Sequence, residues 1–191
     1  MMPKYFDFKL TLQDVEPPPW RRFLLKETAT FADLHLALQD AAGYWDYHLY
    51  EFIGLGNKRL ASSPHDNGGE SPSAAKVKLK SYFPADGICG YIYDFGDMWV
   101  HDVEMLGLVE STEHFTRRLL EGKRAFPPED CGGISGYRNC VKALKHPSKA
   151  DPELLEWLDD WRPESFDLLA VKGAFDLGKR PRPLRAKIAG I

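Results

Sequence analysis

The chain has 191 residues, of which 43% are hydrophobic and 28% are charged, so it is long enough to bury the core of one globular domain. Its net charge of −3 gives no overall attraction to phosphate backbones or anionic lipid, and nucleic-acid affinity would need a local basic patch. The N-terminus lacks an export signal and no stretch approaches the roughly 18 apolar residues of a membrane span, so we expect a cytoplasmic protein with no membrane partner.

Strand patterns dominate the first half of the chain. Residues 4–14 alternate between large apolar and polar side chains, which predicts a half-buried strand. The prolines at 17–19 cannot donate to a strand ladder, and a second strand is predicted after them at residues 21–27. A further strand is predicted over residues 47–55, where His48 shares one face with other aromatic side chains.

A helix is predicted between Thr30 and Gly43. Thr30 is expected to cap its first turn, with Asp33 completing an imperfect capping box, and Gly43 is expected to end it. His35 lies on this helix, where a lone histidine is usually a surface or boundary residue. Residues 61–75 contain almost no large apolar side chain, so they are expected to form a long loop.

The second half of the chain carries mainly helical patterns. A short helix is predicted over residues 112–121, and two more over residues 137–145 and 152–161. The last of these is expected to turn a stripe of large side chains, including Trp157 or Leu158, toward the core. Residues 164–174 form either a helix or a strand. Strands followed by helices predict an α+β fold in one compact domain, with a mixed or antiparallel sheet and helices packed on it.

The most distinctive segment is an acid- and aromatic-rich hairpin predicted over residues 91–105. Its two arms flank a turn at residues 94–97, where we expect Gly96 to take the positive φ that a tight turn demands. The turn is either a two-residue loop, with Asp94 opposite Asp97, or a three-residue loop with Gly96 as a bulge. With either loop, three side chains are predicted to share one face: Asp97, Trp99 and His101.

Strand geometry limits which of these residues could bind the same metal ion. Asp97 and His101 are four residues apart on a strand, so their Cα atoms lie about 13 Å apart and cannot share one ion without a sharp bend. Asp94 and Asp97 are the only locally plausible pair; we assign no metal ligand, and the cofactor, if any, stays unassigned. In a purely structural interpretation, the two aspartates cap turn N–H groups and His101 packs beside Trp99.

The second candidate segment is FPPEDCGG, residues 126–133, which we call the PPED loop. Its rigid proline pair and flexible glycine pair could present Glu129 and Asp130 at a site, where burial of one carboxyl group would suit general acid–base catalysis. The same acids would equally suit capping of the helix that begins near Gly136. Cys131 lacks the electropositive neighbours that lower a thiol pKa, so a catalytic cysteine is not expected.

These segments resemble the plasmid pRiA4b ORF-3-like family, which is related to passenger proteins of transposable elements. The resemblance covers roughly residues 4–175 and depends on these motifs: WRR at 20–22, TFADLH at 30–35, GYW at 43–45 with His48, YDFGD at 93–97 with Trp99 and His101, and PPEDCGG at 127–133 with Tyr137. It implies a compact α+β roll with no settled activity. It also implies that the hairpin, the strand with His48 and the PPED loop converge on one surface. Phe126 stands where the family often has a cysteine, which argues against a cysteine pair with Cys131.

Two functions agree with these features. The first is a binding module for a protein or nucleic-acid partner, associated with plasmid or mobile-element biology. In this interpretation the domain spans residues 1–177, and the basic tail at 178–191 supplies phosphate contacts or serves only as a solvated extension. The candidate nucleic-acid-binding residues are Lys179, Arg180, Arg182, Arg185 and Lys187.

The second function is a hydrolase or nuclease-like enzyme, with or without a divalent ion. Its candidate catalytic residues are Asp94, Asp97, His101, Glu129 and Asp130. The functional surface around them would include His48, Trp99 and Tyr137. The sequence contains no recognised nucleophile elbow, P-loop or HExxH motif, so enzymatic activity depends on this acidic cluster alone.

Overall fold

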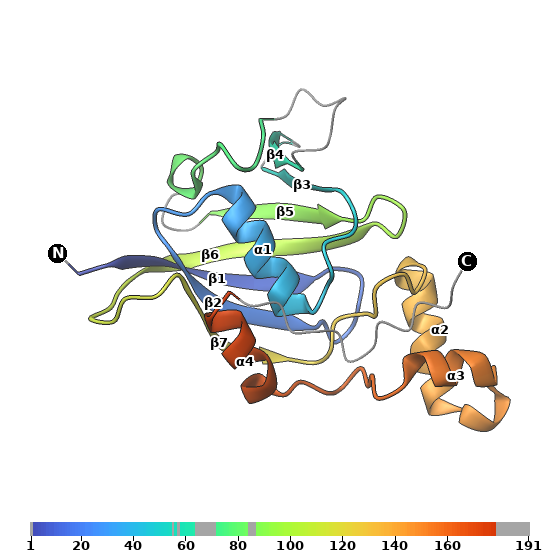
Figure 1. The fold of residues 1–191 in the computed structure, drawn as a ribbon. Helices are drawn as coiled ribbons and strands as arrows, with labels where there is room; N and C mark the ends of the chain where they lie inside the picture. The colour runs from blue at the N-terminus through green and yellow to red at the C-terminus, as the bar shows by residue number, and fades with distance from the viewer. Residues whose placement is uncertain (1, 55, 57, 64–71, 84–86, 179–191) are drawn as a thin grey trace.

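The computed structural model describes residues 2–54, 56, 58–63, 72–83 and 87–178, and Figure 1 shows their arrangement. Within these residues, one antiparallel sheet has the strand order β4-β3-β5-β6-β1-β2-β7. The strands are β1 Lys4–Leu12, β2 Trp20–Lys26, β3 Tyr50–Ile53, β4 Arg59–Ser62, β5 Ile88–Tyr93, β6 Trp99–Glu110 and β7 Arg117–Lys123. The α-helices are α1 Phe31–Ala42, α2 Gly133–Lys145, α3 Pro152–Leu158 and α4 Leu168–Asp176. A single α+β domain was the predicted fold class, and it is confirmed.

One face of the sheet forms the hydrophobic core. The alternation predicted for the first strand is confirmed, because its inward side chains are at most 2% exposed: Phe6, Phe8, Leu10 and Leu12. Helices α1 and α4 lie over this face (Figure 1), where Leu34 and Phe175 are fully buried. The opposite face carries charged groups such as Arg22, whose guanidinium bonds the Asp7 carboxylate. An antiparallel sheet with one apolar and one solvated face explains the alternating pattern.

Helix α1 begins and ends as predicted. Thr30 Oγ1 accepts a hydrogen bond from the Asp33 N–H, and Asp33 Oδ2 accepts one from the Thr30 N–H, which completes the capping box. Gly43 ends the helix with a φ of 86°, the left-handed conformation that glycine adopts without steric cost.

The prediction that His35 lies at the surface or boundary is wrong. Its side chain is 3% exposed, and its two ring nitrogens lie 2.8 Å from the Tyr91 hydroxyl and 2.7 Å from the Asp46 carboxylate. The imidazole also stacks on the Tyr50 ring, with 3.5 Å between ring centroids. Because both nitrogens have hydrogen-bonding partners, burying this polar ring leaves no polar atom unpaired and does not carry the usual free-energy cost.

Three segment predictions need correction. Residues 112–121 do not form a helix, because residues from Arg117 onward pair with β2 as the edge strand β7, and this pairing overrides local propensity. Residues 61 and 62 belong to β4 rather than to the long loop, of which residues 64–71 lie outside the described part of the chain. The strand predicted over 47–55 is restricted to β3, so His48 precedes it.

The helices of the second half follow the prediction more closely. Asp151 caps α3, with Pro152 at its first position. Residues 164–174, left open between helix and strand, contribute to helix α4, which Asp167 caps. None of the helices in the described ranges has the length and apolar character needed to cross a membrane.

Candidate functional site

The hairpin turn joins β5 to β6 through residues 94–98, a longer loop than either predicted form. The register pairs Tyr93 with Trp99, so Asp94 does not lie opposite Asp97 as the two-residue loop required. The added length relieves the repulsion between opposed carboxylates that such a loop would impose.

Two residues other than glycine take the left-handed conformation in this turn. Asp94 has a φ of 58° and Met98 a φ of 54°, whereas the sequence suggested a positive φ at Gly96. Asp94 Oδ1 accepts hydrogen bonds from the N–H groups of Gly96 at 2.9 Å and Asp97 at 3.3 Å. An aspartate that bonds its own turn backbone tolerates this conformation, which explains why glycine is not required there.

Trp99 and His101 face the core, so the prediction that they share a surface with Asp97 is wrong. Both are 0% exposed, because alternation along β6 places them on the buried face of the sheet. His101 Nδ1 donates to the Tyr91 carbonyl at 3.2 Å, and its Nε2 has no partner among the described residues. Burial lowers the pKa of His101 from 6.5 to about 4, so the imidazole is neutral at pH 7. It cannot serve as a solvent-exposed acid or base.

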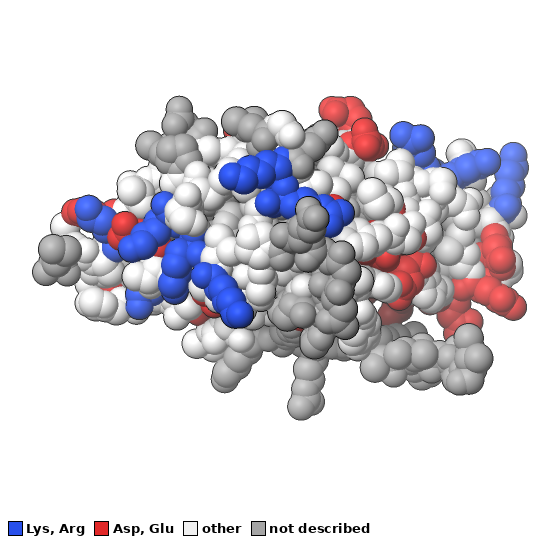
Figure 2. Space-filling view, turned by 90° about the horizontal axis from the view of Figure 1, so that it is seen from above, with Lys and Arg blue, Asp and Glu red and all other residues white. Residues whose placement is uncertain are grey.

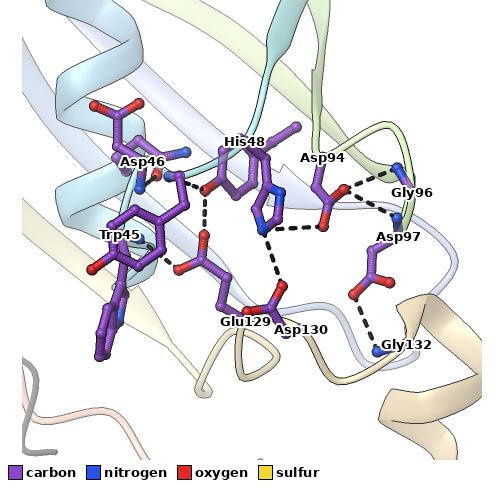
Figure 3. A network of polar contacts seen from close by, with 12 residues as sticks. Trp45, Asp46, His48, Asp94, Gly96, Asp97, Glu129, Asp130 and Gly132 are labelled. Atoms are coloured by element: carbon purple, nitrogen blue, oxygen red, sulfur yellow. Dashed lines mark hydrogen bonds and ion pairs between the residues drawn. The ribbon is translucent and has the colours of Figure 1, made fainter. Parts of the chain in front are cut away.

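Glu129 ties the PPED loop to two other segments (Figure 3). Its Oε2 accepts a hydrogen bond from the Trp45 N–H at 2.7 Å, and its Oε1 accepts one from the Tyr93 hydroxyl. The same hydroxyl accepts a hydrogen bond from the Tyr47 N–H at 3.1 Å. Burial raises the pKa of Glu129, although these donors oppose the shift. This carboxylate therefore links the loop, strand β5 and the connection between α1 and β3.

An imidazole and two carboxylates lie together beside this link (Figure 3). His48 Nε2 is 3.0 Å from Asp130 Oδ1 and 3.6 Å from Asp94 Oδ2. Asp97 Oδ2 accepts a hydrogen bond from the Gly132 N–H at 3.1 Å, which joins the hairpin turn to the far end of the PPED loop. The hairpin turn, the His48 segment and the PPED loop are thus brought together in space, as the sequence motifs suggested.

The ligand atoms of His48, Asp94 and Asp130 all lie within 4.8 Å of one another. Ligands that share a tetrahedral ion at about 2.0–2.2 Å are separated by roughly 3–4 Å, so small side-chain shifts would bring these donors onto one divalent cation. A mixed nitrogen and oxygen donor set suits Zn²⁺ or Mn²⁺ better than Ca²⁺. The arrangement equally allows a metal-free ion pair between protonated His48 and the carboxylates. This set was not predicted, because the spacing along the sequence paired Asp94 only with Asp97.

A pocket of about 810 Å³ opens beside the PPED loop, between the end of α1 and the connection from α3 to α4. We call it the aromatic pocket, after the rings that line it: Trp45, Tyr47, Phe126, Trp157, Trp161 and Phe166. Its volume lies within the range of small-molecule sites, about 300–1,000 Å³. A second hollow of about 420 Å³ lies between α2 and α3 and contains none of the predicted site residues.

The aromatic pocket was not predicted from the sequence. Helical spacing placed Trp157 or Leu158 in the core, and the structure separates the two: Leu158 is 2% exposed, whereas Trp157 is 49% exposed and lines the pocket. Tyr137, predicted at the functional surface, is 5% exposed and packs edge-on against Trp161 at 5.9 Å. It supports the pocket wall from behind. The only available signal was the tryptophan in the GYW motif, Trp45.

The charged side chains on one face of the molecule are mixed. Figure 2 shows Lys and Arg at the centre and left of this face, and Asp and Glu gathered toward the right with further basic groups among them. This charge distribution does not include the predicted basic tail, because its cations lie outside the described residues: Lys179, Arg180, Arg182, Arg185 and Lys187.

Comparisons with known proteins agree with the sequence resemblance. An uncharacterized protein, y4hQ, of Sinorhizobium fredii (strain NBRC 101917 / NGR234) is 36% identical over 157 residues, which cover 78% of each chain. A crystal structure of a protein of unknown function from Methanosarcina mazei Go1 matches with a TM-score of 0.78 and 34% identity, over 87% of this chain and 96% of that one. The model of the family described as "Plasmid pRiA4b ORF-3-like protein" matches residues 4–170. The chain therefore belongs to the plasmid pRiA4b ORF-3-like family.

Proposed function

We propose that this protein is a binding module that captures a partner group in the aromatic pocket. The observation that carries the proposal is the pocket itself, whose walls include residues of the WRR, GYW and PPED motifs. Tyr47 is 66% exposed and Trp157 is 49% exposed, so large rings stand open at the pocket rather than in the core. Clustered exposed aromatic side chains favour contact with a partner, because covering them releases water from a large apolar area.

A protein or small-molecule partner suits this pocket better than a nucleic acid. Glu129 and Asp130 border it, and their carboxylates would repel a polyanionic backbone. The nucleic-acid form of the proposal depends on the tail, and it predicts binding that weakens steeply with salt and is lost on deletion of residues 179–191. The link to plasmid or mobile-element biology belongs to the same proposal and is supported by the family description.

Benzyl alcohol, a neutral ring probe, tests whether the aromatic pocket binds ligands. Titration into ¹⁵N-labelled protein should shift the indole N–H signals of Trp45 and Trp157, and leave that of Trp20 on the opposite face of the sheet unchanged. Trp157→Ala should weaken binding about fivefold, equivalent to roughly 1 kcal/mol of ring contact. The matched Trp20→Ala control should bind as the unaltered protein does. Unperturbed pocket signals at saturating probe would contradict the proposal.

A second candidate function is a metal-assisted hydrolase or nuclease-like enzyme. The cluster of His48, Asp94 and Asp130 favours it, because their donor atoms lie within 4.8 Å of one another. A divalent cation held there would polarise an acyl or phosphoryl oxygen, and the adjoining pocket would hold the remainder of the substrate.

Thermal unfolding with added Zn²⁺, Mn²⁺ or Mg²⁺ tests the metal form of this function. A cation at a hundredfold excess over its Kd stabilises the folded state by about 2.7 kcal/mol, which raises the melting temperature of a chain this long by roughly 5–10 °C. Asp94→Asn should abolish the shift. Asp102→Asn, a matched control on the solvated face, should retain it. Identical melting curves with and without each cation would exclude this function.

A further inference from the structure

Arg21 occupies a position of β2 that alternation assigns to the core. The side chains two and four residues farther along the strand, Phe23 and Leu25, point to the same face and are at most 1% exposed. Arg21 itself is 3% exposed, and it lines the aromatic pocket. A charged side chain here is costly to bury unless other groups compensate its charge.

Backbone carbonyls and an aromatic ring hold the Arg21 guanidinium in place. Nε donates to the Ala41 carbonyl at 3.0 Å. Nη1 donates to three further carbonyls at 2.8–3.0 Å: those of Trp20, Lys123 and Arg124. The guanidinium lies over the Phe166 ring, with 3.6 Å from Cζ to the ring centroid. These contacts fix the orientation of the guanidinium, but none of the contacting groups carries a full negative charge that would neutralise it.

The Arg21 side chain retains both an unpaired charge and unused donors. Within the described part of the chain, it forms no ion pair with a carboxylate, and its Nη2 makes no hydrogen bond. Burial lowers the pKa of Arg21 to about 9, so the guanidinium is still charged at pH 7. Two N–H bonds of a buried cation are therefore available at the wall of the pocket.

The carboxylates around the aromatic pocket are engaged with other donors. Glu129 accepts hydrogen bonds from a backbone N–H and a tyrosine hydroxyl. Asp130 bonds His48, and Asp167 accepts hydrogen bonds from two N–H groups in the first turn of α4. Arg21 is thus the only cation among the described residues that line the pocket, and none of these carboxylates pairs with it.

We propose that the aromatic pocket binds a monovalent organic carboxylate, with its carboxyl group on Arg21 Nη2 and its apolar body against the aromatic wall. The inference rests on the proposed binding function and names its ligand class. Guanidinium and carboxylate groups form short charge-assisted hydrogen bonds, which are stronger inside a protein than in water. A phosphate dianion matches less well, because Glu129 and Asp130 border the same pocket.

Four probes that share one ring separate this inference from the proposed function. Isothermal titration at pH 7 should show that benzoate binds about tenfold more tightly than benzyl alcohol, benzylammonium or phenyl phosphate. Similar affinity for benzoate, the alcohol and the ammonium would overturn the role of Arg21 while leaving the pocket as a binding site. Tighter binding of phenyl phosphate would overturn the choice of carboxylate. Failure of all four to bind would refute the proposed function itself.

Substitution of Arg21 provides the matched comparison. Arg21→Gln should reduce benzoate affinity to that of benzyl alcohol and leave benzyl alcohol binding unchanged. Arg22→Gln, the adjacent arginine on the solvated face, should bind both probes as the unaltered protein does. Because Arg21→Gln loses carbonyl contacts and could unfold, a second measurement uses the unaltered protein: benzoate, but not benzyl alcohol, should shift the Arg21 Nε–H signal in the NMR spectrum. An unmoved signal at saturating benzoate would overturn the inference.

Discussion

Replacing His101 by phenylalanine should make the protein less sensitive to mild acid. The imidazole is 0% exposed, and its neighbours include the rings of Tyr91 and Phe126 at 5.4 and 5.9 Å between centroids, so a phenyl ring is chemically compatible with the site. The substitution removes the hydrogen bond from Nδ1 to the Tyr91 carbonyl, at a cost of roughly 1 kcal/mol at neutral pH.

The size of the acid effect follows from the two pKa values. Burial lowers the pKa of His101 to about 4 in the folded protein, against 6.5 for an unperturbed histidine. Above pH 6.5 neither state binds the proton. Between pH 6.5 and 4 the unfolded chain binds it and the folded chain does not, so the free energy of unfolding falls as the pH falls. At about 1.4 kcal/mol per pH unit, His101 alone removes roughly 3 kcal/mol over this range.

Urea unfolding at pH 7.0 and pH 4.5 measures the difference. Between these two conditions the unaltered protein should lose roughly 2–3 kcal/mol more than the His101→Phe variant, and its melting temperature should fall by about 4–12 °C more. His114 is exposed, and the matched His114→Phe control should lose as much as the unaltered protein. Equal losses in the unaltered protein and in His101→Phe would refute the argument that a neutral, buried imidazole resists protonation.

Other substitutions test the contacts that shape the site and core. Glu129→Gln should lower the free energy of unfolding in urea by about 1–2 kcal/mol. Because the pKa of Glu129 is raised in the folded protein, its ionisation lowers stability as the pH rises through that pKa, and the variant should lack this pH-dependent loss. An unchanged dependence of stability on pH would contradict this. Gly133→Ala should cost about 1–3 kcal/mol in thermal unfolding, because φ is 65° and the new Cβ would lie 2.7 Å from a backbone oxygen of the hairpin turn. Gly173→Ala, with open space around the new Cβ, should be neutral or stabilising. Arg117→Met should cost about 3–5 kcal/mol by leaving the buried Asp40 carboxylate unpaired, and adding Asp40→Leu should recover most of that loss; no recovery would argue against the pairing.

Local features of this protein were determined by the sequence itself. Thr30 and Gly43 mark the ends of α1, because a side-chain cap and a left-handed glycine act within one turn of the helix. The alternation of residues 4–12 places β1 with one face in the core, since side chains along a strand point to opposite faces. The motifs around Trp45, Asp97 and Glu129 were sufficient to indicate the family and to suggest that three segments meet.

Only the tertiary structure decided which side chains face solvent and which face each other. His101 and Trp99 looked like surface residues of the hairpin, but the face they share is covered by the core. His48 and Asp130 are 82 residues apart in the chain and bond each other at 3.0 Å. The charge of Arg21 and the ring of Trp157 on α3 meet in one pocket, although no local pattern connects them. Capping and alternation act over a few residues, whereas burial and pairing depend on strand order and on helices packed from distant parts of the chain.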